Sequence, residues 1–170
     1  MTNTDKLQLT NQTIPLANHP RLRNWLLGLR ALALVAASPA RRQLWAEMRA
    51  YVRDMPAALA GPLPQALAAQ TPATADLGLP AREVRLLADS AALFERRSPL
   101  GVCLRRSLVR YHFLCRAGIP LTINFGARFK GVVADRQVTG HAWVTLDGKP
   151  YFEDGENYQG FTVMLRYPQA

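Results

Sequence analysis

The chain has 170 residues, of which 49% are hydrophobic, and its 21 basic against 12 acidic residues give a formal net charge of +9. That length and apolar content predict one domain with a proper hydrophobic core and room for a helical annex. The basic residues are spread along the chain, and no helix-turn-helix, zinc-finger or RNA-binding motif accompanies them. We therefore expect no nucleic-acid partner, since charge alone indicates solubility and acidic partners.

The first twenty residues are polar and lack the basic-then-apolar pattern of a secretory signal peptide. We expect them to form a flexible start in which His19 is incidental. Residues 25–38 are the most apolar run, but Arg30 interrupts them and a membrane span needs about 20 apolar residues. We therefore expect a soluble protein, with contact between residues 25–38 and a membrane surface as the alternative.

Helical spacing of apolar residues runs through residues 20–55. The pair Ser38-Pro39 predicts a break there, because a residue before proline disfavours helical backbone. Residues 56–80 are rich in proline and alanine, which indicates a loose connection with one short helix near residues 64–70.

The pattern changes at residue 81. Residues 81–97, AREVRLLADSAALFERR, have the apolar spacing of one amphipathic helix. We therefore divide the chain into a helical N-terminal extension with a Pro/Ala-rich linker, residues 1–80, and a core, residues 81–170.

A second helix of the core begins with a cysteine. In SPLGVCLRRSLVRYHFLCRAGIP (98–120), Ser-Pro and Gly precede the helix, and Gly-Ile-Pro ends it. Cys103 falls in the first turn, where unpaired N–H groups and the helix dipole stabilise a thiolate. Cys115 lies in mid-helix and is interpreted as a small core residue.

The two cysteines are too far apart to form a disulfide. Cys103 and Cys115 are separated by about 18 Å along one helix, whereas a disulfide needs Cα atoms within about 7 Å. Reduced thiols are typical of the cytoplasm, where we expect the protein to reside. His112 and Cys115 stand three residues apart on this helix, but two ligands are too few for zinc, so we expect no metal.

Four segments after the helix have β-branched and aromatic residues bounded by Gly and Asp: residues 121–129, 138–146, 149–154 and 160–168. Their hairpin-length connections indicate an antiparallel sheet. Because the helices come before all of the strands, we expect an α+β fold with the helices packed on one side of the sheet.

The segment TGHAWVTLDGKPYFED (139–154) reads as a hairpin, since Asp147-Gly148 is a favoured two-residue turn. With this turn at the tip, His141 faces Asp154 as a non-hydrogen-bonded pair, the type with the closer side chains. Asp154 is thereby placed to orient the imidazole. A longer or bulged turn would slip the register and bring Glu153 to the histidine instead.

Cys103, His141 and Asp154 are the parts of a Cys–His–Asp triad, in which a base lies within reach of the thiol and a carboxylate fixes the tautomer of the base. The plainer interpretation is that Cys103 packs in a core and His141 is a satisfied polar residue of a strand. In the same register Trp143 faces Phe152, where the two rings would wall a cleft or make ordinary cross-strand packing.

Several short motifs resemble those of a known family. They are a Cys-Leu pair at a helix start, a Gly-Ile-Pro helix end and a hairpin: Cys103-Leu104, Gly118-Ile119-Pro120, His141-Ala142-Trp143-Val144 and Asp147-Gly148. Over residues 82–168 the chain resembles the transglutaminase-like cysteine peptidase superfamily, and within it the bacterial lasso peptide biosynthesis B2 proteins. The resemblance implies a transglutaminase-like (papain-like) core, with helices packed on an antiparallel sheet of about four strands.

The resemblance also implies a function. B2 proteins are leader peptidases that cut a ribosomally made precursor so that a partner ATP-dependent cyclase can close a macrolactam. Carried over, Cys103 is the nucleophile, His141 the general base and acid, and Asp154 or Glu153 the orienting carboxylate, with no cofactor. Because residues 1–80 lack the strands of a winged-helix recognition module, a separate small protein is expected to recognise the leader.

Two other functions fit the same residues. One is another acyl-transfer enzyme using this triad, a transglutaminase or deamidase. The other is a non-catalytic module that uses its arginines and residues 25–38 to hold a peptide, a membrane surface or nucleic acid. An unreactive Cys103 and binding that weakens steeply with salt would indicate the module.

Overall fold

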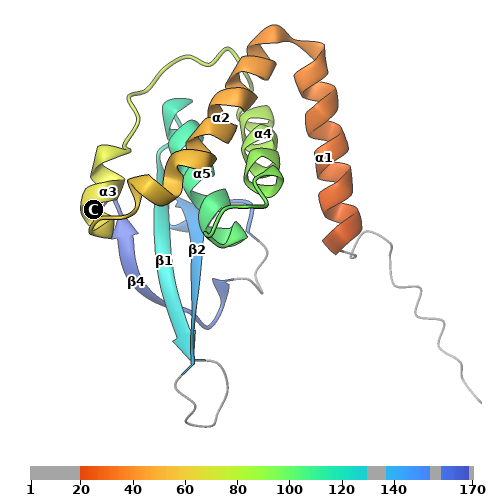
Figure 1. The fold of residues 1–170 in the computed structure, drawn as a ribbon. Helices are drawn as coiled ribbons and strands as arrows, with labels where there is room; N and C mark the ends of the chain where they lie inside the picture. The colour runs from red at the N-terminus through yellow and green to blue at the C-terminus, as the bar shows by residue number, and fades with distance from the viewer. Residues whose placement is uncertain (1–19, 130–136, 154–157, 169–170) are drawn as a thin grey trace, which may run out of the picture.

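The computed structural model describes residues 20–129, 137–153 and 158–168. The expected flexible start, including His19, lies outside the described residues. Figure 1 shows helices gathered against one face of a sheet, with the first helix outermost. The described part of the chain is therefore α+β, as the order of its elements predicts.

The N-terminal helices break where the sequence indicates. Helix α1 spans Pro20–Ala37 and helix α2 spans Pro39–Ala58. Ser38 between them has an extended backbone, with φ −157° and ψ 136°, and Pro39 occupies the first position of α2. Proline suits that position because an N–H in the first turn of a helix has no acceptor within the helix. The N–H that proline lacks is therefore not missed.

Three further helices follow. Helix α3 spans Leu63–Ala69, α4 spans Ala81–Phe94 and α5 spans Val102–Arg116. The end of α5 is fixed by Gly118, whose φ of +86° is a left-handed conformation. There the amide of Ile119 donates to the carbonyl of Leu114 at 2.9 Å, which closes the last turn.

The sheet has four antiparallel strands in the order β3-β2-β1-β4. The strands are β1 Leu121–Phe129, β2 Val138–Leu146, β3 Lys149–Pro150 and β4 Thr162–Tyr167. The expected sheet of about four strands is thus confirmed, although the strand after the Asp-Gly turn has only two residues. Among the described helices, none combines the length and the apolar character needed to cross a bilayer.

One face of the sheet carries the hydrophobic core. Ile123 of β1 pairs with Val144 of β2, and both are fully buried. The same core takes side chains from four helices, among them Met48, Leu67, Val84, Leu87, Leu108 and Leu114. Helices α2 and α3 therefore share this core with α4 and α5. The division of the chain into domains at residue 80 stays a prediction.

The other face of the sheet carries aromatic rings in place of a helical layer. His141 and Trp143 alternate with Ala142 and Val144 along β2, so their side chains point away from the core. The ring of Trp143 lies over Gly126 of the neighbouring strand and stays buried.

Gly126 is required for this packing. A Cβ added there would lie 2.9 Å from two ring atoms of Trp143 and 3.1 Å from Cβ of Phe161. Because the buried indole has little room to move, Gly126→Ala is expected to lower the free energy of unfolding by about 1–3 kcal/mol. Urea denaturation followed by tryptophan fluorescence measures this change. Gly61→Ala is the matched control, since nothing lies within 4 Å of its Cβ, and an equal loss there would contradict the prediction.

Candidate active site

The first candidate residue, Cys103, is the second residue of α5 and is partly exposed. Gly101 caps the helix, and its carbonyl accepts the first helical hydrogen bond from the amide of Arg105 at 3.1 Å. The N–H groups of this first turn have no partners within the helix, and together with the helix dipole they stabilise an anion. The thiol thus lies at the electropositive end of the helix, as the sequence predicts.

Helix α5 runs alongside β2, with the start of the helix near the start of the strand and the two ends near each other. Near its start, Ser107 Oγ donates to the carbonyl of Ala142 at 2.8 Å. Near its end, the thiol of Cys115 lies 3.8 Å from the carbonyl of Leu121, whose strand partner is Leu146. Cys103 precedes Ser107 by one helical turn on the same face. The first turn of α5 therefore lies along the part of β2 that carries His141.

His141 is half-buried and surrounded by rings. Its imidazole stacks on Trp143 at 5.9 Å between centroids and lies 5.3 Å from the ring of Phe161. Nε2 is buried and has no hydrogen-bond partner among the described residues. In the same part of the chain, no hydrogen bond joins the thiol of Cys103 to this imidazole. The start of α5 and the strand thus lie side by side, but the imidazole lies among the rings on the face of the sheet that points away from the core, and the described residues form no thiol–imidazole hydrogen bond.

The surroundings of His141 favour its neutral form. Burial lowers the pKa of the imidazole, and the positive charges of Arg106 on α5 and Arg128 on β1 lower it further. A neutral imidazole is the form that can accept a proton from a thiol. The shift therefore keeps His141 competent as a base at a lower pH than an ordinary histidine.

Removing either positive charge is expected to raise the pKa of His141. Arg106→Gln and Arg128→Gln each delete one of the charges that oppose protonation, so the midpoint moves up toward about 6.5, the usual value for histidine. Titration of the imidazole C–H signals by NMR measures this midpoint. Arg53→Gln, at an exposed position of α2, is the control. If the pKa of His141 is the same in all three variants as in the wild type, Arg106 and Arg128 do not lower it.

Of the two carboxylates expected beside His141, the structure describes only Glu153. Asp154 lies outside the described residues, so its pairing with His141 stays a prediction. The side chain of Glu153 is fully buried and lies between two arginines of α5. Arg106 donates to Glu153 Oε2 at 3.1 Å, and Arg110 donates to Oε1 at 2.9 Å.

These ion pairs belong to an ion cluster in which Asp89, Arg110 and Glu153 are buried and Arg106 is partly exposed. Asp89 accepts from Arg110 Nε at 2.5 Å and from Nη2 at 2.9 Å, which is a bidentate pair. Burial alone would lower the pKa of Arg110, but the hydrogen bond and charge of Asp89 and the charge of Glu153 raise it. The cluster therefore holds Arg110 charged and connects α4, α5 and the segment after β3.

Sequence reasoning missed this cluster, although a signal was present. Asp89 falls among the apolar residues of α4, next to Leu87 and Ala88, and Arg110 lies between Val109 and Tyr111 of α5; all of these residues are buried. A charge on the inner face of each of two adjacent helices indicates a buried ion pair.

The hairpin turn forms as predicted, but its second arm is short. Asp147 and Gly148 have φ values of 50° and 74°, and Leu146 pairs with Lys149. The ladder ends after Pro150, apart from a bond from the amide of Tyr151 to the carbonyl of Val144 at 2.9 Å.

The expected cross-strand pair of Trp143 and Phe152 is wrong. Phe152 has a φ of 52°, a left-handed conformation that extended strands do not contain, and its side chain is 57% exposed. Its ring contacts Tyr151 and lies 4.2 Å from the guanidinium of Arg85. Trp143 instead stacks with Tyr158 of the segment before β4.

Cys115 and His112, which also lie on α5, have structural surroundings. Burial raises the pKa of Cys115. His112 stacks on Tyr51, and its Nδ1 lies 2.9 Å from the carbonyl of Gln70, while burial lowers its pKa. No group of three or more His, Cys, Asp or Glu residues in the described ranges could hold a metal ion.

Helices packed on a four-stranded antiparallel sheet are consistent with a transglutaminase-like core. The sequence matches the family model described as the transglutaminase-like superfamily over residues 49–166, more than half of the chain. The chain therefore belongs to the transglutaminase-like superfamily, whose members are typically cysteine-dependent acyl-transferases or peptidases. No curated protein and no solved structure matches it.

Proposed function

We propose that this chain is a cysteine peptidase that removes the leader from a ribosomally made lasso peptide precursor. The observation that carries the proposal is the packing of the first turn of α5 along β2, through the 2.8 Å bond from Ser107 Oγ to the carbonyl of Ala142. Cys103 precedes Ser107 by one helical turn and His141 precedes Ala142 in β2, which supports the proposed pair. Superfamily membership supports acyl transfer by a cysteine, and the motif resemblance supports the leader peptidase within it.

The proposed mechanism has two acyl-transfer steps. His141 takes the proton of the Cys103 thiol, and the sulfur attacks the scissile carbonyl to form a tetrahedral intermediate. The backbone N–H of Cys103, at the helix start, donates to the oxyanion. Collapse of the intermediate breaks the C–N bond, and protonated His141 gives its proton to the leaving amine. A water activated by His141 then hydrolyses the thioester, which releases the acid and restores the thiol.

The orienting carboxylate is assigned to Asp154. Glu153 is the alternative, but both of its oxygens accept from arginines of α5, which leaves it less able to hold an imidazole. The residues invoked require no cofactor. The partners in the proposal are the precursor leader, a separate small leader-recognition protein and an ATP-dependent macrolactam cyclase.

The test is incubation of the purified chain with candidate lasso precursor peptides, with and without a candidate leader-recognition protein. We expect two fragments whose masses sum to the precursor plus one water, and no cleavage by Cys103→Ala at unchanged circular dichroism. Ammonia release without peptide-bond cleavage would replace the peptidase by a transglutaminase or deamidase. Full cleavage by Cys103→Ala would overturn both.

A further inference from the structure

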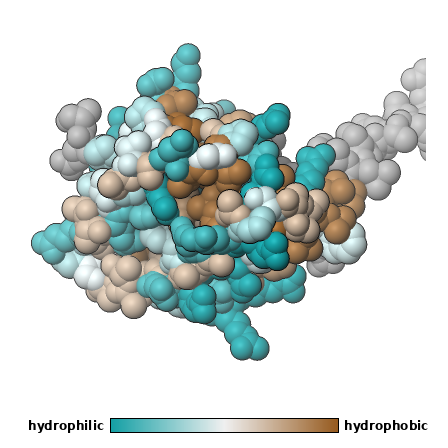
Figure 2. Space-filling view, turned by 90° about the horizontal axis from the view of Figure 1, so that it is seen from above, coloured by the Kyte–Doolittle hydropathy of each residue, from teal (hydrophilic) through white to brown (hydrophobic). Residues whose placement is uncertain are grey.

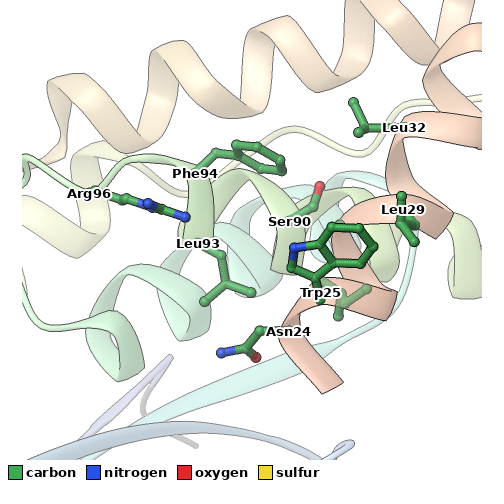
Figure 3. Close-up of a pocket in the computed structure, with 10 residues that line it drawn as sticks. Asn24, Trp25, Leu29, Leu32, Ser90, Leu93, Phe94 and Arg96 are labelled. Carbon is green, nitrogen blue, oxygen red and sulfur yellow. The ribbon is translucent and has the colours of Figure 1, made fainter. Parts of the chain in front are cut away.

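An open apolar groove lies between α1 and α4, away from the candidate active site. Its volume is about 590 Å³. Figure 3 shows side chains of the two helices facing each other across it, with Arg96 at one end and Leu32 at the other. The apolar lining residues are Trp25, Leu27, Leu29, Leu32, Leu93 and Phe94.

The walls of this groove expose large hydrophobic side chains. Trp25 is 68% exposed, Leu29 and Leu32 are each 47% exposed, and Phe94 is 41% exposed. Figure 2 shows apolar surface of this kind on the helical end of the molecule, bordered by hydrophilic side chains. Apolar surface gathered around a hollow and rimmed by polar groups is typical of an interaction site.

The groove is held in place from behind. Ala31 of α1 is buried, and Leu34 and Val35 of the same helix pack against the core. On the α4 side, Phe94 makes an edge contact with Trp45 at 5.7 Å, and Ser90 Oγ accepts from Trp45 Nε1 at 2.9 Å. The exposed rings and leucines are therefore presented by fixed helices.

The shape and the spacing of the lining fit a helix. Trp25, Leu29 and Leu32 recur at intervals of four and three along α1, which places them in one stripe. A third helix laid between two packed helices inserts apolar residues of the same spacing into such a groove. A flat lipid surface would touch the rims and leave the hollow unfilled.

The charged residues at one end of the groove favour an acidic binding partner. Among the described residues that line the groove, Arg96 is the charged one, and Arg97, which follows it in the chain, is likewise exposed. Glu95 in the same stretch lies 3.8 Å from the guanidinium of Arg49 and is thereby partly neutralised. On the opposite wall, helix α1 contains no acidic residue. The end of the groove beside Arg96 therefore carries positive charge.

We propose that this groove binds an amphipathic helix of a partner protein, with an apolar face in the groove and acidic residues at the end beside Arg96. The proposal concerns binding alone and stands apart from the peptidase activity, so either can fail without the other.

The test uses two synthetic helical peptides with the same leucine-rich apolar face, one flanked by glutamates and one by lysines. Binding is followed by the emission of Trp25, which should shift to shorter wavelength as the exposed indole is covered. We expect the acidic peptide to bind at least about tenfold more tightly than the basic one, with the difference reduced by salt.

Substitutions locate the site. Leu29→Glu and Arg96→Glu should each weaken binding of the acidic peptide by about tenfold or more. Leu26→Glu is the matched control, because Leu26 is 45% exposed on α1 but does not line the groove. Equal weakening by Leu26→Glu, or equal affinity for both peptides, would overturn the proposal.

Two other occupants are distinguished by the same variants. If Leu29→Glu abolishes binding to vesicles of anionic phospholipid while neither peptide binds, the surface is a membrane contact and the proposal is wrong. If sedimentation shows a dimer of the wild-type chain that Leu29→Glu dissociates, and neither peptide binds, the occupant is a second copy and the proposal is likewise overturned.

Discussion

Arg110→Ala is expected to lower the free energy of unfolding by about 3–5 kcal/mol, the loss that follows when one member of a buried ion pair is removed. The Arg110 side chain is 3% exposed and donates to Asp89 and Glu153, whose side chains are 4% and 0% exposed. Without Arg110, Asp89 retains Arg85 at 3.0 Å, and Glu153 retains Arg106 at 3.1 Å. Two buried carboxylates would then each lose a charged partner.

Urea denaturation measures this change, and the same helix offers a matched control. Arg116 pairs with Glu47 at 3.0 Å, but both side chains are about one-third exposed, at 33% and 39%. Arg116→Ala should therefore cost less than about 1 kcal/mol, as exposed ion pairs do. Similar losses for the two variants would show that burial of Arg110 adds nothing.

A double-mutant cycle tests the pairing itself. If Asp89 and Arg110 stabilise the fold mainly through each other, the loss in Asp89→Ala/Arg110→Ala should be smaller than the sum of the two single losses. Arg110→Lys should recover only part of the stability, because lysine cannot reproduce the bidentate contact. If the loss in the double variant equals the sum of the two single losses, Asp89 and Arg110 stabilise the fold independently.

His141→Ala is expected to slow precursor cleavage by about 10²–10⁴-fold, the usual contribution of a general base. Without the imidazole, the thiol of Cys103 has no neighbouring base to take its proton. The direct measurement is the rate of Cys103 alkylation by iodoacetamide between about pH 5 and 10. It is made in Cys115→Ala protein so that one thiol reacts.

The proposed pair predicts that iodoacetamide alkylates wild-type Cys103 faster than it alkylates Cys103 of His141→Ala. An identical pH profile in both proteins would remove His141 from the mechanism. Substitutions of the two carboxylates are expected to have different effects. We expect Asp154→Asn to slow cleavage at unchanged stability, whereas Glu153→Gln should lower stability because the bonds from Arg106 and Arg110 lose their charge.

Local signals predicted most of the fold. Proline before α2, the left-handed Gly118 after α5 and the Asp147-Gly148 turn act within a few residues of chain, so sequence alone located them. The position of Cys103 follows from the same helix boundaries. Extending the hairpin register to residue 154 assumed regular strand geometry, and Phe152 interrupts it.

Long-range features were not predictable in this way. The burial of Glu153 depends on two arginines that are more than forty residues away along the chain. The lowered pKa of His141 depends on Arg106 and Arg128, which come from a helix and another strand. Such contacts exist only once the helices pack on the sheet, and no local pattern encodes them.

The two arginines that bind Glu153 hold residues 151–153 in place before substrate binds. Strand β3 ends at Pro150, so the chain that leads toward Asp154 departs from the sheet and is fastened to α5 by the two arginines. Conformational entropy of this stretch is therefore lost when the protein folds, before any substrate arrives. Residues 151–153, ordered in advance, add no ordering cost to substrate binding. On heating, this stretch should lose its order together with the helical core.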